Sequence, residues 1–287
     1  MIFTYERDLI SDAFHRKNIA LRVQRDPRTN LSKNLLLGCP FHHVRFGIIK
    51  NGSIDFDAGY TSRFGALTPT DLVMLYCYLY LPRHHAELQS TFDRCSTWID
   101  DVSIPGLVTW LVDLGCGPGT AGLAFADHCR GAPFHYFGFD RSSAMRSTAQ
   151  SLLNEARLSG LIDRESKFSI ASEMFNPAII HDLFPIPVNI IFVASYLFAS
   201  KSLDIVSLAQ TLNAVILRDR VKAAVFLYVN STTKFANRSY ERFVRELGPI
   251  RRLGVKEQQI QYRRYAGRIA GKAQFVNDCM ILKELSP

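Results

Sequence analysis

The hydrophobic positions divide the chain into two parts, of which the second is more regular. From residue 107 onward, short apolar runs alternate with longer segments whose apolar residues recur at helical spacing. The expected strands lie at about 108–113, 134–139, 168–170, 188–193 and 223–229, and the expected helices begin at about 120, 143 and 203. Strands that alternate with helices predict a parallel sheet covered on both faces, which is a doubly wound α/β fold.

The first 105 residues lack this alternation. The expected elements are a helix over 4–21, a hairpin with strands at 44–49 and 53–57, and a helix over 68–81. Asn51-Gly52 favours a tight turn between the two strands, Thr68-Pro69 is a typical helix start, and Pro82 is expected to end that helix. We therefore expect an N-terminal, mainly helical extension with a β-hairpin (1–105) and a second domain (106–287).

One short motif carries most of the functional information. Val112-Asp113-Leu114-Gly115-Cys116-Gly117-Pro118-Gly119-Thr120 lies between an expected strand and an expected helix. Glycines at such a turn let a ligand approach the backbone, and the first helical turn offers free N–H donors. The three glycines alternate, whereas the dinucleotide fingerprint G-x-G-x-x-G would need its third glycine at Thr120. The spacing therefore disfavours a dinucleotide.

An acidic residue followed by alternating glycines at a strand end resembles the first motif of the class I S-adenosylmethionine-dependent methyltransferases. Twenty-one residues after Gly119, the next expected strand ends at Asp140, where this family has an acidic residue that binds both ribose hydroxyls. The resemblance implies S-adenosylmethionine as the cofactor and a doubly wound, mostly parallel seven-stranded sheet. It also implies a terminal antiparallel pair of strands, which the segments 258–265 and 273–282 suit.

The resemblance also implies a set of cofactor-binding residues. They are Asp113, Gly115, Cys116, Gly117, Gly119, Asp140, Arg141, Ser172, Glu173 and Met174. Among them, Asp113 would lie near the ammonium group or an ordered water, the glycines would approach the methionine portion, and the segment 172–174 would contact adenine. Cys116 is expected to pack inside the loop rather than to react.

The end of the fourth expected strand faces the methyl acceptor in this family. Here it reads Ala194-Ser195-Tyr196-Leu197-Phe198, without the two prolines that usually mark enzymes acting on exocyclic amines of bases. Ser195 and Tyr196 are the candidates to position the target by hydrogen bonding and stacking, although Tyr196 is equally compatible with the core.

Charge is unevenly distributed and suggests a partner. The net formal charge is +8, but residues 214–287 carry 15 Lys and Arg against 6 Asp and Glu. In the helix expected over 234–245, cations spaced by four, four and three residues share a face, and further arginines lie among tyrosines. The candidate nucleic-acid-binding residues are Lys234, Arg238, Arg242, Arg245, Arg263, Arg264 and Arg268.

This basic surplus favours an RNA substrate, because such a surface attracts polyanions. Three alternatives stay open: the cations form only a solvated face, the enzyme acts on a small molecule beneath a lid, or the chain binds cofactor or a partner without catalysis. Neither the composition nor any apolar run indicates a membrane protein, and no secretory signal is evident, so we expect a soluble, cytoplasmic protein. The pairs His42-His43 and His84-His85 lack metal-ligand spacing, and we expect no metal site and no disulfide framework.

Overall fold

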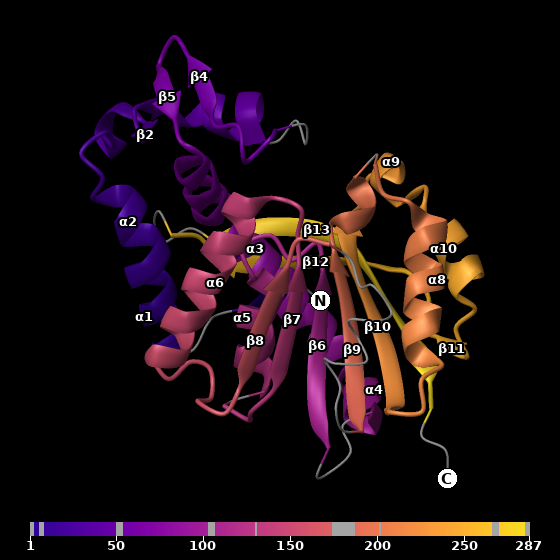
Figure 1. Cartoon of the computed structure of the whole chain (residues 1–287). Coiled ribbons are helices and arrows are strands. Elements are labelled where there is room, and N and C mark those ends of the chain that lie inside the picture. The colour runs from indigo at the N-terminus through magenta and orange to yellow at the C-terminus, as the bar shows by residue number, and fades with distance from the viewer. Residues whose placement is uncertain are drawn as a thin grey trace.

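In the computed structural model, the described residues are 3–5, 9–49, 54–102, 107–129, 131–173, 187–200, 202–265 and 270–284. They form a central sheet of nine strands (Figure 1). The order across the sheet is β1 (Phe3–Tyr5), β12 (Lys256–Arg263), β13 (Ala270–Lys283), β10 (Val221–Ser231), β9 (Val188–Ser195), β6 (Val108–Leu114), β7 (His135–Phe139) and β8 (Lys167–Ala171). The ninth strand, β11 (Arg251–Arg252), pairs with β13.

The sheet is parallel except for β13, which runs antiparallel to both β10 and β12. The expected α/β doubly wound fold with a terminal antiparallel pair is therefore confirmed. The expected count of seven strands is wrong, because β1 and β11 join as two short additional strands. Neither was predictable from a local pattern, since each has only two or three residues and is held by pairing with a distant strand.

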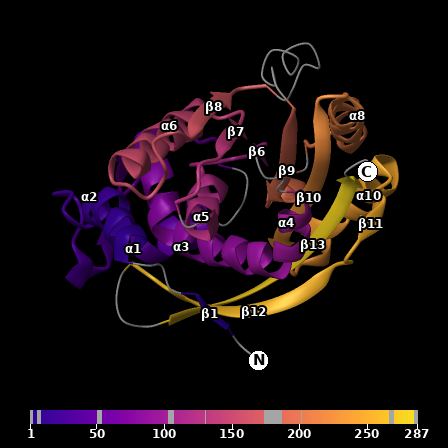
Figure 2. The same cartoon turned by 90° about the horizontal axis from the view of Figure 1, so that it is seen from below.

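Helices cover both faces of the sheet, as Figures 1 and 2 show. One apolar cluster joins the sheet to α5 (Thr120–Cys129), α6 (Ser143–Leu158) and the extension. The other joins it to α8 (Ile205–Ile216) and α10 (Tyr240–Leu247). Because both faces are covered, β9 and β10 are buried along almost their whole length, which explains their continuous apolar sequence.

The extension begins differently from the prediction. A helix over 4–21 was expected, but residues 3–5 form β1, which pairs in parallel with β12. The helical part comprises α1 (Leu9–His15), η1 (Arg16–Ala20) and α2 (Leu21–Gln24), which follow one another without a break. In Figures 1 and 2 these helices lie at the opposite end of the molecule from α8 and α10.

The expected hairpin at 44–57 is also wrong. Residues His43–Ile49 form a π-helical segment, η3, and Asn51-Gly52 lies outside the described residues. A strand would have placed Val44 and Phe46 on one face, but Val44 is buried whereas Phe46 is exposed. Short antiparallel pairs form elsewhere: β2 (Leu35–Leu36) with β3 (Cys39–Pro40), next to the 3-10 turn η2 (Leu31–Lys33), and β4 (Tyr60–Ser62) with β5 (Gly65–Leu67).

The long helix α3 (Pro69–Arg94) starts as predicted and ends later. Thr68 and Asp71 form a capping box, each side chain accepting a backbone N–H of the other. Pro82 lies inside the helix and does not end it. A proline in a helix interior costs about 3 kcal/mol. Burial of Leu88 and Phe92 beyond it contributes roughly 1.5–3 kcal/mol each, which is enough to offset that cost.

After α3, the short helix α4 (Ser96–Val102) contacts β9 and β10. The buried residues of α3 share one apolar cluster with α5, α6 and β10, so the extension and the sheet are packed together. Among the described residues, no helix is long and apolar enough to cross a membrane.

Candidate functional site

The glycine loop joins β6 to α5, and its three alternating glycines all have positive φ values of 74°, 51° and 81°. A Cβ on Gly115 would lie 3.1 Å from Leu197, and one on Gly119 would touch α6, so these two glycines allow close packing. Gly117 differs, because nothing lies within 4 Å of its Cβ position. The loop therefore leaves its backbone open to a ligand at Gly117.

Asp140 follows β7 and is held by two backbone groups. Its Oδ2 accepts the N–H of Gly117 at 2.9 Å, and its Oδ1 accepts the N–H of Ser142 at 2.9 Å. A carboxylate can accept about four hydrogen bonds, so each oxygen keeps a further lone pair for a ligand. Burial raises the pKa of Asp140, while the two backbone donors and nearby Arg146 oppose that rise. The loop thus fixes one acidic acceptor at the carboxyl end of β7.

Asp113 lies beneath the loop, at the end of β6. It is 1% exposed and accepts a hydrogen bond from the Tyr136 hydroxyl at 2.8 Å. Burial raises the pKa of Asp113 to about 7, although the Tyr136 hydrogen bond acts in the opposite direction. Cys116 is also buried, and burial raises the pKa of its thiol well above the usual value. A neutral, buried thiol suits packing.

A narrow cavity of about 30 Å³ separates the glycine loop from α3 and the end of β9. Its lining residues are Tyr76, His84, Asp113, Gly115, Cys116, Gly117, Pro118, Thr120, Ala121, Ser195 and Tyr196. The structure therefore brings both candidate target residues, Ser195 and Tyr196, next to the glycine loop. It also adds two residues of the extension, Tyr76 and His84.

Tyr196 has partners within the protein. Its φ of 61° is left-handed, its hydroxyl donates to Glu87 Oε2 at 2.9 Å, and Arg83 donates to that hydroxyl at 3.1 Å. Glu87 is fully buried and also accepts hydrogen bonds from Arg83 at 2.7 Å and from His84 Nδ1 at 3.0 Å. Tyr196 is thus anchored to α3. Because its hydroxyl is already hydrogen-bonded, its ring is the main group that can contact a methyl acceptor.

The residues of α3 were missed because Pro82 was expected to end the helix. With the helix continued, Arg83 and Glu87 are spaced i,i+4 and His84 and Glu87 i,i+3, the spacings at which charged side chains meet on a helix. His85 in turn lies 3.1 Å from Asp127 of α5. Within the described part of the chain, no group of three or more His, Cys, Asp or Glu residues is arranged to hold a metal ion.

A second cavity, of about 510 Å³, opens beside Asp140. Its lining residues are Ile54, Asp55, Phe56 and Asp57 of the extension, and Asp140, Arg141, Ser142 and Met145 of the core. Arg141 is exposed there. Ser172 and Glu173 follow β8, are exposed, and line neither cavity, and Met174 lies outside the described residues.

The candidate nucleic-acid-binding residues fall into two groups. The expected continuous helix over 234–245 is wrong, because α9 (Lys234–Asn237) and α10 are separated by a turn at Arg238-Ser239. All four cations of this segment are exposed, and α9 contacts the turn η4 (Leu197–Ala199) that follows Tyr196. Arg263 instead lies 3.9 Å from Asp12 of α1, with Arg264 beside it, and Arg268 lies outside the described residues.

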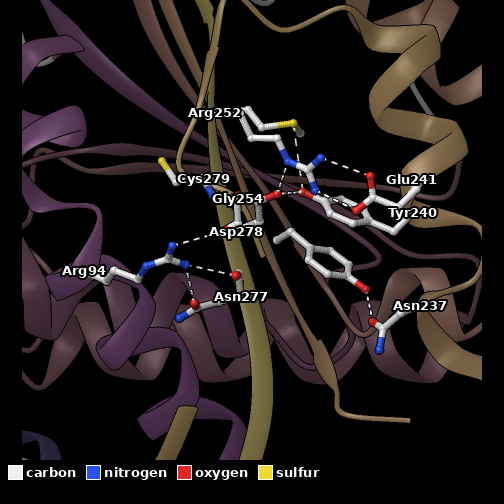
Figure 3. A network of polar contacts seen from close by, with 11 residues as sticks. Arg94, Asn237, Tyr240, Glu241, Arg252, Gly254, Asn277, Asp278 and Cys279 are labelled. Carbon is white, nitrogen blue, oxygen red and sulfur yellow. Dashed lines mark hydrogen bonds and ion pairs between the residues drawn. The ribbon is translucent and has the colours of Figure 1, made fainter. Parts of the chain in front are cut away.

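Not every cation of the basic C-terminal part is available to a partner. Figure 3 shows Arg252 between Asp278, Glu241 and the ring of Tyr240. Asp278 is fully buried and also accepts a hydrogen bond from the Tyr240 hydroxyl at 3.1 Å. Arg252 therefore ties β11 to β13 and α10, and we assign it a structural role.

No family model matches the chain, and no curated protein matches it. Among solved structures, the chain is similar to a precorrin-6y C5,15-methyltransferase from Geobacter metallireducens, with 13% identity, 67% of this chain and 88% of the other covered, and a TM-score of 0.41. It is similar to a magnesium protoporphyrin IX methyltransferase from Synechocystis solved with bound S-adenosylmethionine, with 12% identity, 84% of this chain and 93% of the other covered, and a TM-score of 0.37. It is also similar to a putative RNA methyltransferase from Pyrococcus horikoshii, with 12% identity, 70% of this chain and 83% of the other covered, and a TM-score of 0.39.

The strand order with its antiparallel β13, the glycine loop after β6 and the acidic end of β7 give this chain the fold of the class I methyltransferases. We infer its activity from its own site.

Proposed function

We propose that this chain is an S-adenosylmethionine-dependent methyltransferase. The observation that carries the proposal is Asp140, whose carboxylate is oriented by the N–H groups of Gly117 and Ser142. Asp140 lines the larger cavity, and its partner Gly117 lines the narrow one. One cavity lies along the glycine loop and the other lies beside the start of α6. A ligand with a diol for Asp140, a base for the larger cavity and an amino acid directed along the glycine loop would match these groups.

The residues of the site match the parts of this cofactor. Asp140 would accept hydrogen bonds from the ribose hydroxyls through its remaining lone pairs. Gly117 would let the methionine portion approach the backbone, and Asp113 would face its ammonium group. The cofactor would supply the methyl group on an activated sulfonium.

The chain itself would contribute positioning. Holding two reactants in line can supply effective molarities of about 10⁵–10⁸ M, and this displacement has a neutral leaving group. The ring of Tyr196, fixed by Glu87 and Arg83, and the hydroxyl of Ser195 would orient the acceptor at the end of β9. Packing of α3 against this end would exclude water.

For the substrate, we propose RNA. The support is the surplus of cations in residues 214–287 and the exposed Lys234, Arg238, Arg242 and Arg245. Of these, Lys234 lies on α9, which contacts η4 beside the target end of β9. Neutralising Arg238, Arg242 and Arg245 together should weaken RNA binding and reduce its salt dependence, because fewer counterions are released. Absence of RNA binding by the wild-type protein at low salt would refute this part.

A small molecule is the second candidate substrate. The narrow cavity between α3 and the glycine loop favours it, because Tyr76, His84 and Tyr196 enclose the target side with rings rather than with cations. Incubation of the protein with tritiated S-adenosylmethionine and fractionated cell extract separates the two candidates. Label in RNA supports the first, and label in the low-molecular-weight fraction supports the second.

Cofactor binding is tested separately by calorimetry. Asp140→Ala should abolish tight binding of S-adenosylmethionine, whereas Asp219→Ala, which removes an exposed acid in the turn after α8, should not change it. Equal affinity of Asp140→Ala and the wild type would refute the assignment of the site. Cofactor binding without label transfer to any fraction would indicate a non-catalytic cofactor-binding module.

A further inference from the structure

The cavity of about 510 Å³ is built from two parts of the chain that are far apart in sequence. One wall is the segment 54–57 of the extension, and the other is the end of β7 with the first turn of α6. Its volume lies in the range of about 300–1,000 Å³ that is typical of sites for small ligands. Asp140 lines it, whereas the target residues Ser195 and Tyr196 line the narrow cavity.

We propose that the extension completes the nucleoside half of the cofactor site, with Phe56 contacting the base and Asp57 locking this wall onto α6. This inference rests on the proposed function and deepens it. It assigns to Phe56 and Asp57 a role at the base end of the cofactor, for which the sequence suggested the segment 172–174. Two independent features of the structure support it.

The first feature is the attachment of Asp57 to the start of α6. Its carboxylate accepts hydrogen bonds from the hydroxyls of Ser142 and Ser143, and from the backbone N–H groups of Ser143 and Ala144, at 2.9–3.0 Å. These donors hold the pKa of Asp57 at about 2, below its ordinary value. A carboxylate at a helix N-terminus is stabilised by the unpaired N–H groups there. This contact fixes the segment directly beside Asp140, because Ser142 donates to both acids.

The second feature is the chemistry of the cavity. Ile54, Phe56 and Met145 give it an apolar part, and Asp140 gives it a fixed hydrogen-bond acceptor. A planar base joined to a diol has the same two parts. The Phe56 ring is itself supported, since it makes an edge contact with Tyr76 at 5.8 Å between centroids. Tyr76 lines the narrow cavity, so one pair of rings connects the nucleoside side of the site with the methyl side.

The test is isothermal titration of the full chain with S-adenosylhomocysteine and, separately, with adenosine. Phe56→Ala should weaken both ligands by a similar factor, about 5- to 150-fold, because contact between a base and an aromatic ring is worth that much. Phe46→Ala removes an exposed ring from the same extension and outside the cavity, so both affinities should stay within twofold of wild type. Asp57→Ala should weaken both ligands as well, since it releases the wall.

Phe56→Leu replaces Phe56→Ala in this test if the alanine variant does not fold, because leucine keeps the apolar volume and removes the aromatic ring. Wild-type affinity in Phe56→Leu and in Asp57→Ala would overturn this inference and leave the proposed function intact. Failure of the wild type to bind S-adenosylhomocysteine would instead refute the proposed function, and this inference with it. Loss of S-adenosylhomocysteine binding with unchanged adenosine binding would also overturn the inference, because the wall would then contact the amino-acid half.

Discussion

Glu87 offers the sharpest test of how the extension is joined to the site. It is fully buried on α3 and accepts hydrogen bonds from Arg83, His84 and Tyr196. Glu87→Gln keeps the shape of the side chain but removes the charge. Breaking a buried ion pair by removing one partner costs about 3–5 kcal/mol. Because the Arg83 side chain is 28% exposed, solvent screens part of its charge, and we expect a loss of about 3 kcal/mol.

The loss can be measured by urea unfolding and by calorimetry. For a chain of this size, about 3 kcal/mol corresponds to a decrease of roughly 6–12 °C in Tm. Tyr196→Phe removes one donor and leaves Glu87 with two, so it should cost only about 1 kcal/mol. Asp93→Asn, on the same helix with a side chain that is 58% exposed, is the matched control and should cost less than about 0.5 kcal/mol.

The pH dependence gives an independent check. Burial alone would raise the pKa of Glu87, but the hydrogen bonds and charges of His84 and Arg83 hold it below its ordinary value of 4.5. A carboxylate whose pKa is lowered by folding stabilises the protein above its unfolded pKa, and this stabilisation is lost as the pH falls through the folded pKa. The difference between wild type and Glu87→Gln should therefore be full at pH 7 and shrink below about pH 4.5. A difference below 1 kcal/mol at pH 7 would refute the reasoning.

Three further predictions concern single residues. Gly117→Ala and Gly160→Ala both place a Cβ in open space at a positive φ, so each should cost about 1 kcal/mol of stability. Only Gly117→Ala should abolish binding of S-adenosylhomocysteine in calorimetry. Equal binding by both variants would place the ligand elsewhere. Because the pKa of Asp113 is about 7, an ammonium group bound beside it should bind about tenfold tighter at pH 8 than at pH 6, and Asp113→Asn should remove this dependence. A pH-independent wild-type affinity would contradict that role. Arg252→Gln leaves the fully buried carboxylate of Asp278 without its cation, and it should cost about 3–5 kcal/mol in urea unfolding. Arg251→Gln, at a side chain that is 52% exposed, is the control and should cost less than about 0.5 kcal/mol. Equal losses would contradict the structural role of Arg252.

Much of the fold followed from local patterns. The buried strands β9 and β10 read as continuous apolar runs, and β7 and β8 could be placed between helices of the expected lengths. The elements that were predicted wrongly, β1, η3 and the second half of α3, have partners far away in the chain. Pro82 illustrates the reason: its local effect opposes a helix, and only burial of the residues beyond it against the sheet reverses the outcome.

The candidate site also combines residues that local sequence predicted with residues that only the structure revealed. The sequence by itself determined the glycine loop and Asp140, because the backbone conformation of the loop and the position of an acid after an apolar strand are encoded within a few residues. Only the tertiary structure decided what surrounds them. Asp57 meets Ser142 across 85 residues, and Glu87 meets Tyr196 across 109. No local pattern encodes such pairs, since their stabilisation comes from burial and hydrogen bonds that exist once the extension has packed against the sheet.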